Sequence, residues 1–407
     1  MWKAPREGRT SILSILDLRE RNYRLAVVNG WLVWLGDAFF NPYIVLAGFA
    51  AALGVPGSLV GLLPALLYAG TLLPQAFLVG YVSRLPRKIL LYRRMAALRL
   101  LGLSLVTLSA LFLGPWPGAL LGGFFLGLSL NALFNGISNL PFWEVLAKAI
   151  PREKRSGLFS ARNLIGGFLA FLAGLLTREI LALDLPFPLP YALVFALGTL
   201  AFGIGWYLFG LIDEPEDPPS SQRPDLLAPL KDPGFRRYLG VRAFLALGGM
   251  AEPFFAAYAV QKLGQKEELG LYLAFYALSF TLCNLLWAQL AQKSSKRVLL
   301  PGMALALLAL LLAPLLPPGT FGVVFFLQGA YLSAFGLATS TYLLNLAPEE
   351  KRSAYIGLGN TLAGVMGFAP VLGGVVLDRL GFSALFLLAA LAYALGLLLG
   401  RRLPQEG

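Results

Sequence analysis

Residues 151–163, PREKRSGLFSARN, occur a second time in altered form at residues 348–360, PEEKRSAYIGLGN. Apolar matches carry little weight in a chain that is 57% hydrophobic, but ungapped matches of polar residues are informative. The two segments therefore indicate an internal duplication. At a constant offset of 197 residues, the identical positions include Pro151, Arg155, Ser156 and Asn163, which match Pro348, Arg352, Ser353 and Asn360.

Two further pairs of segments extend this repeat. RKILL at residues 87–91 aligns with KRVLL at residues 296–300, at an offset of 209. The offset falls along the chain, which predicts shorter loops in the second copy. Near the start of each copy the offset is 215, where Tyr23, Asp37, Phe39, Phe40 and Tyr43 align with Tyr238, Glu252, Phe254, Phe255 and Tyr258.

Apolar segments long enough to cross a bilayer run through the whole chain. Only 13% of the 407 residues are charged, and the mean hydropathy is +0.72. About 20 apolar residues in a helix cross roughly 30 Å of hydrocarbon. We predict an all-α integral membrane protein with about twelve spans, at residues 25–50, 57–82, 89–113, 118–147, 157–178, 190–212, 238–261, 269–291, 298–316, 320–346, 354–377 and 382–400.

The basic residues fall almost entirely on one side of these spans. Only Arg178, Lys262, Lys266 and Arg379 lie on the other side, while the remaining 29 of the 33 Lys and Arg residues lie with the two termini. This bias predicts that both termini are cytoplasmic in a multi-pass inner-membrane protein. It also explains the net charge of +12 by contact with anionic lipid instead of nucleic acid.

The longest polar connection divides the chain into two halves. We predict a cytoplasmic N-terminal segment at 1–24 without a secretory signal, a six-helix bundle at 25–212, a Pro-rich cytoplasmic linker at 213–235, a second six-helix bundle at 236–400 and a cytoplasmic tail at 401–407. Six spans is an even number, so both bundles have the same orientation. This predicts a pseudo-twofold axis along the membrane normal.

The composition excludes several kinds of chemistry. The chain has no histidine and a single cysteine, Cys283, so His-dependent catalysis, His-based metal sites and an internal disulfide are absent. No nucleotide-binding loop is present. We therefore expect no enzyme activity, no catalytic residues, no metal and no cofactor.

The chain resembles transporters of the major facilitator superfamily along nearly all of its length. The resemblance rests on twelve spans, a 6+6 parallel repeat, a long central loop and internal termini. The superfamily's motif between spans 2 and 3 is present in degenerate form as GYVSRLPRK, where Gly80, Arg84, Arg87 and Lys88 fit and Ser83 replaces the acid. The resemblance implies alternating access around a central cavity lined by spans 1, 4, 7 and 10.

Polar residues inside the spans are candidates for that cavity, because polarity in hydrocarbon is costly. Asn131, Asn135 and Asn139 are spaced i, i+4 and i+8 on span 4, and the repeat pairs Asn131 with Gln328. The alternative is hydrogen bonding between helices. We expect the cavity to be lined by Asn29, Trp34, Asn41, Asn131, Asn135, Asn139 and Gln328.

Asp37 and Glu252 occupy matched positions in the first span of each half. Each lies about 20 Å along its helix from the cytoplasmic end, close to mid-membrane. A carboxylate there costs at least about 2.5–3.5 kcal/mol. We expect the two acids to face each other across the cavity and to couple proton movement to transport. Binding of a cationic substrate and a structural role are the alternatives.

Other polar and small residues have simpler interpretations. We expect Arg99 and Arg162 to extend to the lipid headgroups, with binding of an anionic substrate as the alternative. Glu144 is expected to form an interfacial salt bridge. The small residues of GFAPVLGG, at 367–374, are expected to allow close helix packing.

These observations predict a secondary active transporter for a small organic solute, with export favoured over import. The low number of charges expected in the cavity favours a neutral or amphipathic molecule. A membrane helper protein and an uptake permease for sugars or other neutral metabolites are the alternatives. We expect a monomer whose other partners are membrane lipid and protons.

Overall fold

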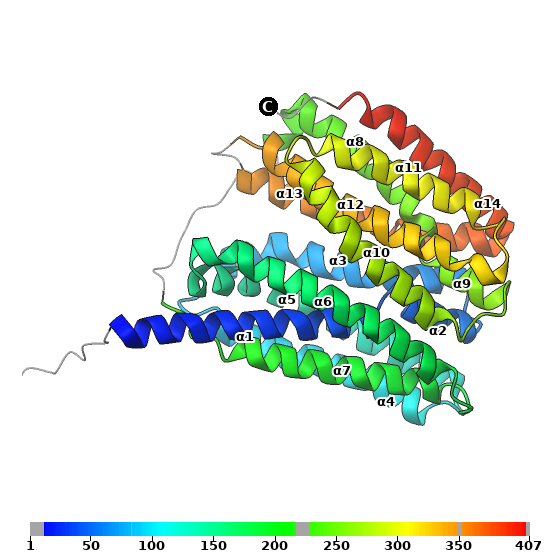
Figure 1. The fold of residues 1–407 in the computed structure, drawn as a ribbon, viewed down its shortest axis with the longest axis horizontal. Coiled ribbons are helices and arrows are strands. Elements are labelled where there is room, and N and C mark those ends of the chain that lie inside the picture. The colour runs from blue at the N-terminus through cyan, green and yellow to red at the C-terminus, as the bar shows by residue number, and fades with distance from the viewer. Residues whose placement is uncertain (1–11, 83, 217–227, 349–351, 404–407) are drawn as a thin grey trace, which may run out of the picture.

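The computed structural model describes residues 12–82, 84–216, 228–348 and 352–403. Within these ranges the chain is helical and contains no strand. Ser83 of the predicted loop motif lies outside them. Figure 1 shows the helices of the N-terminal half in the lower part of the molecule and those of the C-terminal half in the upper part.

Each half of the sequence forms one bundle. The N-terminal bundle contains α1 (Ile12–Phe39), α2 (Val45–Ala52), α3 (Gly57–Val82), α4 (Ile89–Phe112), α5 (Pro117–Ala149), α6 (Arg152–Leu181) and α7 (Leu189–Gly210). The C-terminal bundle contains η1 (Ala228–Lys231), α8 (Pro233–Gly248), η2 (Gly249–Ala251), α9 (Phe254–Gln261), α10 (Leu269–Ala291), α11 (Lys296–Leu312), η3 (Pro318–Thr320), α12 (Gly322–Leu346), α13 (Arg352–Met366) and α14 (Ala369–Gly400).

These helices make twelve crossings. In the described ranges, nine segments are individually long and apolar enough to span a membrane. One of them, Tyr355–Gly400, has 46 residues and would measure about 69 Å as a single helix, so it contains two crossings. The first span, α1 with α2, and the 17-residue α11 complete the twelve.

The last two crossings are separated by a single glycine. Gly381 has φ +81°, a value that residues with a Cβ rarely adopt, and it interrupts the helical conformation inside α14. The chain turns there. Span 11 therefore consists of α13 with the first part of α14, and span 12 follows Gly381, close to the predicted boundary between 377 and 382.

The first span of each half is broken near its acidic residue. The N-terminal half breaks between Phe39 and Val45, around Pro42, and the C-terminal half breaks at η2, just before Pro253. Proline lacks an N–H and clashes with the preceding turn, which favours a break at these places. The spans predicted at 25–50 and 238–261 are therefore each built from more than one helical segment.

The beginning of α1 also differs from the prediction. The helix begins at Ile12 instead of residue 25, so it extends well beyond the apolar segment. An ion pair between Glu20 and Arg24, 3.2 Å apart and separated by one helical turn, lies on this extension. Such pairs stabilise a helix outside the apolar segment, where the hydrocarbon of the membrane does not enforce it.

The two ends of the molecule differ. We call the end where α1 begins and α14 ends the terminal end, and the opposite end, which contains Gly57 and Gly381, the far end (Figure 1). The two halves pack against each other mainly through α6 with α10 and through α3 with α13 and α14.

Candidate functional site

Two cavities lie along the contact between the halves. The Asp37 cavity has a volume of about 430 Å³ and is lined by residues of the N-terminal half and of α10. The Glu252 cavity has a volume of about 470 Å³ and is lined by α3 together with the C-terminal half. Tyr43, Pro64, Tyr68 and Leu72 line both, so the cavities are adjacent.

Asp37 faces the first cavity from α1. Its side chain is exposed to that space, close to the end of the helix at Phe39. Arg99 of α4 and Arg162 of α6 lie within electrostatic range, although neither comes within 4.0 Å of its carboxylate in the described structure. The acid therefore lines a cavity inside the protein.

Arg99 turns inward to the same cavity. Its guanidinium lies 3.8 Å from the centre of the Trp206 ring, and its Nε is 3.4 Å from the Asn131 Oδ1. A second nitrogen is 3.4 Å from the Ser138 hydroxyl. The expectation that Arg99 extends to the headgroups was wrong, because α5 and α7 offer it polar and aromatic partners in the interior.

Arg162 was also expected to extend to the headgroups, and this expectation was wrong as well. It is only 8% exposed. Its guanidinium donates to the Ala26 carbonyl at 2.6 Å and to the Asn29 Oδ1 at 3.0 Å. These bonds tie α6 to α1, so Arg162 has a packing role in this conformation.

Four of the predicted cavity residues line the Asp37 cavity: Trp34, Asn41, Asn131 and Asn135. Asn135 donates to the Thr71 hydroxyl of α3 at 2.6 Å. The Asn41 Oδ1 accepts from the backbone N–H groups of Tyr43 and Ile44, both at 3.0 Å, so it also satisfies donors at the break in the first span. Cavity lining and interhelical bonding coexist in these residues.

The other three, Asn29, Asn139 and Gln328, line neither cavity. Asn29 is buried and donates to the Gly205 carbonyl at 2.8 Å. Gln328 is fully buried, and its Nε2 donates to the Glu252 carbonyl at 3.2 Å. A residue eight positions along a helix is rotated by about 80°, which explains why Asn139 leaves the face shared by Asn131 and Asn135.

Glu252 lies at the break in span 7 and lines the second cavity. It is 7% exposed, and its Oε1 accepts a hydrogen bond from the Tyr393 hydroxyl at 3.2 Å. The acids were expected to face each other, but they line separate, adjacent cavities. Tyr276 of α10 lies within electrostatic range of both.

The two halves contact each other at the far end. The Asp378 carboxylate accepts from the N–H groups of Gly57 at 2.7 Å and Ser58 at 3.1 Å, which caps α3 from the other half. Arg178 and Glu268 form a salt bridge at 3.2 Å between α6 and α10. These contacts hold the two halves together at the far end.

The fold is similar to that of solved membrane transporters. A structure of the nucleoside transporter NupG superposes with a TM-score of 0.70 at 12% identity, covering 93% of this chain and 98% of that one. The xylose transporter XylE from E. coli, in a partially occluded inward-open conformation, gives 0.68 at 14% identity, covering 96% and 98%. These likenesses concern the fold. Residues 243–406 match the family model of the Major Facilitator Superfamily. The match covers most of the C-terminal half, which resembles this superfamily in sequence.

Curated proteins share part of this chain's sequence. An uncharacterized protein of Mycobacterium tuberculosis is 24% identical over 324 residues, which cover 74% of this chain and 63% of the relative. A protein of Deinococcus radiodurans named as a proposed sugar efflux transporter is 36% identical over 170 residues, covering 38% of this chain and 42% of the relative. The chain thus spans less than two thirds of the length of these curated relatives.

The superfamily's loop motif pairs with acids of the N-terminal half. Arg87 lies 2.9 Å from Glu216, and Lys88 lies 3.0 Å from Glu144, so the expected interfacial salt bridge of Glu144 is present. Arg84 lies in the turn after α3, and Gly80 lies in its last turn.

Two functional candidates did not emerge from the sequence analysis. Arg242 of α8 lines the Glu252 cavity and donates to the Tyr68 hydroxyl at 3.1 Å, across the contact between the halves. A charged residue inside the apolar segment 238–261 was the available signal. Glu214 was also missed, because it stands in a polar segment where acids are common.

Proposed function

We propose that the protein is a secondary active transporter that moves a small organic solute across the inner membrane by alternating access. The observation that carries the proposal is the placement of Asp37 and Glu252. Each lies at the break in the first span of its half, and each lines one of two adjacent cavities between the halves. A purely structural membrane protein has no need for two such acids in polar spaces.

The distribution of basic residues supports an orientation with the terminal end in the cytoplasm. The far end, where the halves contact each other, is then the outer end, and these contacts support an inward-facing state. The contacts of Asp378 and of Arg178 with the other half would have to separate before the cavities could open outward.

Proton coupling is the second part of the proposal. The groups that face Asp37 are Arg99, Arg162 and Tyr276. Those that face Glu252 are Tyr43, Tyr276, Tyr331 and Tyr393. Because Tyr276 is the one neighbour common to these two sets, single substitutions separate the contributions of the acids. A proton bound in one conformation and released in the other would drive solute movement.

Export is the proposed direction, with a sugar-like solute as the first class to test. The relative from Deinococcus radiodurans, which is named as a proposed sugar efflux transporter, supports both the direction and the class of solute. An importer would use the same cavities, and the direction of movement against an imposed proton gradient distinguishes the two.

The test is solute movement in proteoliposomes under an imposed pH gradient, with solutes first selected by their effect on thermal stability. We expect the wild-type protein to accumulate solute when the gradient is present. The Asp37→Asn, Glu252→Gln double variant should lose this response, and each single variant shows which acid is needed. Glu216→Gln, an exposed acid at the terminal end, is the matched control. Movement that still follows the gradient in the double variant contradicts proton coupling through these acids.

A further inference from the structure

The Arg242 side chain lines the Glu252 cavity. Most of its N–H groups make no hydrogen bond to a described residue. It lies on α8, half-buried, among the lining residues. Its single hydrogen bond to a described residue goes to the Tyr68 hydroxyl, and no described carboxylate lies within 4.0 Å. A guanidinium carries five N–H donors, so it can take a further, bidentate partner.

The other interior arginines differ in this respect. Arg162 is 8% exposed, and its donors reach a carbonyl and an amide. Arg99 rests on Trp206 and contacts two polar side chains of α5. Arg242 has only a phenol from the opposite half. Charged residues inside membrane spans usually face a cavity or a partner and mark substrate or ion pathways.

The nearby acid does not serve as that partner. Glu252 lines the same cavity, but it is 7% exposed and accepts its hydrogen bond from Tyr393. In this conformation the arginine, and not the carboxylate, is the charge most accessible from the cavity.

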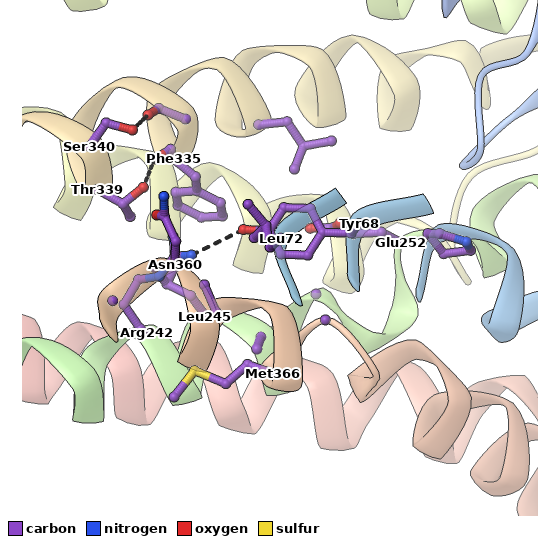
Figure 2. A pocket seen from close by; sticks show the side chains of 18 of the residues that line it. Tyr68, Leu72, Arg242, Leu245, Glu252, Phe335, Thr339, Ser340, Asn360 and Met366 are labelled. Atoms are coloured by element: carbon purple, nitrogen blue, oxygen red, sulfur yellow. Dashed lines mark hydrogen bonds between the residues drawn. The ribbon is translucent and has the colours of Figure 1, made fainter. Parts of the chain in front are cut away.

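The groups around Arg242 suit the rest of a hydroxylated solute. Figure 2 shows the side chains of Arg242, Asn360 and Tyr68 converging on one side of the cavity, with Thr339 and Ser340 beside them. The hydroxyls of Thr339 and Ser340 donate to carbonyls of their own helix, at 2.7 and 2.9 Å, so their oxygens can accept from a ligand. A volume of about 470 Å³ fits a small molecule.

We propose that the Glu252 cavity binds the anionic group of a hydroxylated organic anion, a carboxylate or a phosphate monoester, through Arg242. This inference rests on the proposed function and narrows its substrate class. It replaces the sequence-based expectation of a neutral or amphipathic solute, because Arg242 brings a positive charge into the cavity that the sequence analysis did not count.

The test compares three solutes that differ in charge: glucose, gluconate and glucose 6-phosphate. The readout is the thermal unfolding temperature of the purified, full-length protein. We expect gluconate or glucose 6-phosphate to raise it while glucose does not, and the preferred anion separates the carboxylate from the phosphate. Arg242→Gln should weaken anion binding by about tenfold or more. Arg237→Gln, an exposed arginine of the same helix, should not.

A second variant separates ligand binding from a structural role. If Arg242 served only to hold Tyr68, Tyr68→Phe would abolish the anion effect as completely as Arg242→Gln does, and this outcome overturns the inference. Retained anion binding in Tyr68→Phe, with partial recovery in Arg242→Lys, supports it.

The remaining outcomes are also decisive. Equal stabilisation by glucose and by the anions overturns the inference, and so does the absence of any anion effect in the wild-type protein. Neither result tests the proposed transport function. That function is tested separately, by the response to a pH gradient, which depends on Asp37 and Glu252.

Discussion

At the residue scale, Glu214 joins three parts of the N-terminal half. Its side chain is fully buried just after α7. One oxygen accepts from the first backbone N–H of α4, at Ile89, at 2.6 Å, and the other lies 2.8 Å from the Lys148 ammonium of α5. An acid at a helix N-terminus and in a buried ion pair is held by two favourable interactions.

We predict that Glu214→Ala destabilises the protein by about 3 kcal/mol, because it removes both a buried ion pair and a helix cap. The midpoint of thermal unfolding in detergent measures the change. Glu216→Ala is the control. Its pair with Arg87 is more than half exposed on both sides, so the expected loss is below about 1 kcal/mol. Equal losses in the two variants would show that Glu214 is not the more important contact.

At the scale of elements, glycines allow the two halves to approach closely at the far end. A Cβ on Gly61 of α3 would lie 2.0 Å from the Pro370 carbonyl oxygen of α14. A Cβ on Gly374 would lie 2.2 Å from the Gly57 carbonyl oxygen. The small residues of 367–374 therefore serve close packing, as the sequence analysis expected.

We predict that Gly61→Ala forces α3 away from α14 and increases the population with an open far end. Spin labels at Asp184→Cys and Glu267→Cys, with Cys283→Ser, report this as a longer distance between the halves. The control is Gly122→Ala, because a Cβ there meets nothing within 4 Å. An unchanged distance distribution in Gly61→Ala would mean that the interface adapts without opening.

At the scale of the whole molecule, the two halves exchange few polar contacts at the far end, and Asp378 makes two of them. Two bundles joined by a small set of separable contacts can reach a second arrangement without unfolding. The balance between the arrangements then depends on single side chains.

We predict that Asp378→Ala shifts this balance toward an open far end by about 1 kcal/mol, a typical effect of losing a helix cap and roughly a fivefold change in population. The same labelled pair measures it. The control is Thr320→Ala, an exposed residue at the same end whose hydroxyl donates to the Pro317 carbonyl of its own turn. If both variants leave the populations equal to those of the parent, the cap does not contribute to closure.

The sequence by itself determined the membrane crossings, the duplication and the positions of the two acids. Hydrocarbon thickness acts on each apolar segment separately, so local composition is sufficient to find the spans. The repeat then helped to match positions in the two halves, and Asp37 and Glu252 both lie near the break in the first span of their half. The helix breaks around Pro42 and before Pro253 were missed, since proline is tolerated in many membrane helices.

Only the tertiary structure decided where long polar side chains point. Arg99 and Arg162 turn inward because Trp206, Asn131, Asn29 and the Ala26 carbonyl, all distant in sequence, come within reach when the helices pack. The partnership of Arg242 with Tyr68 exists only where the two halves meet. An arginine side chain is long enough to reach either lipid headgroups or the interior, and the partners on neighbouring helices determine which it does.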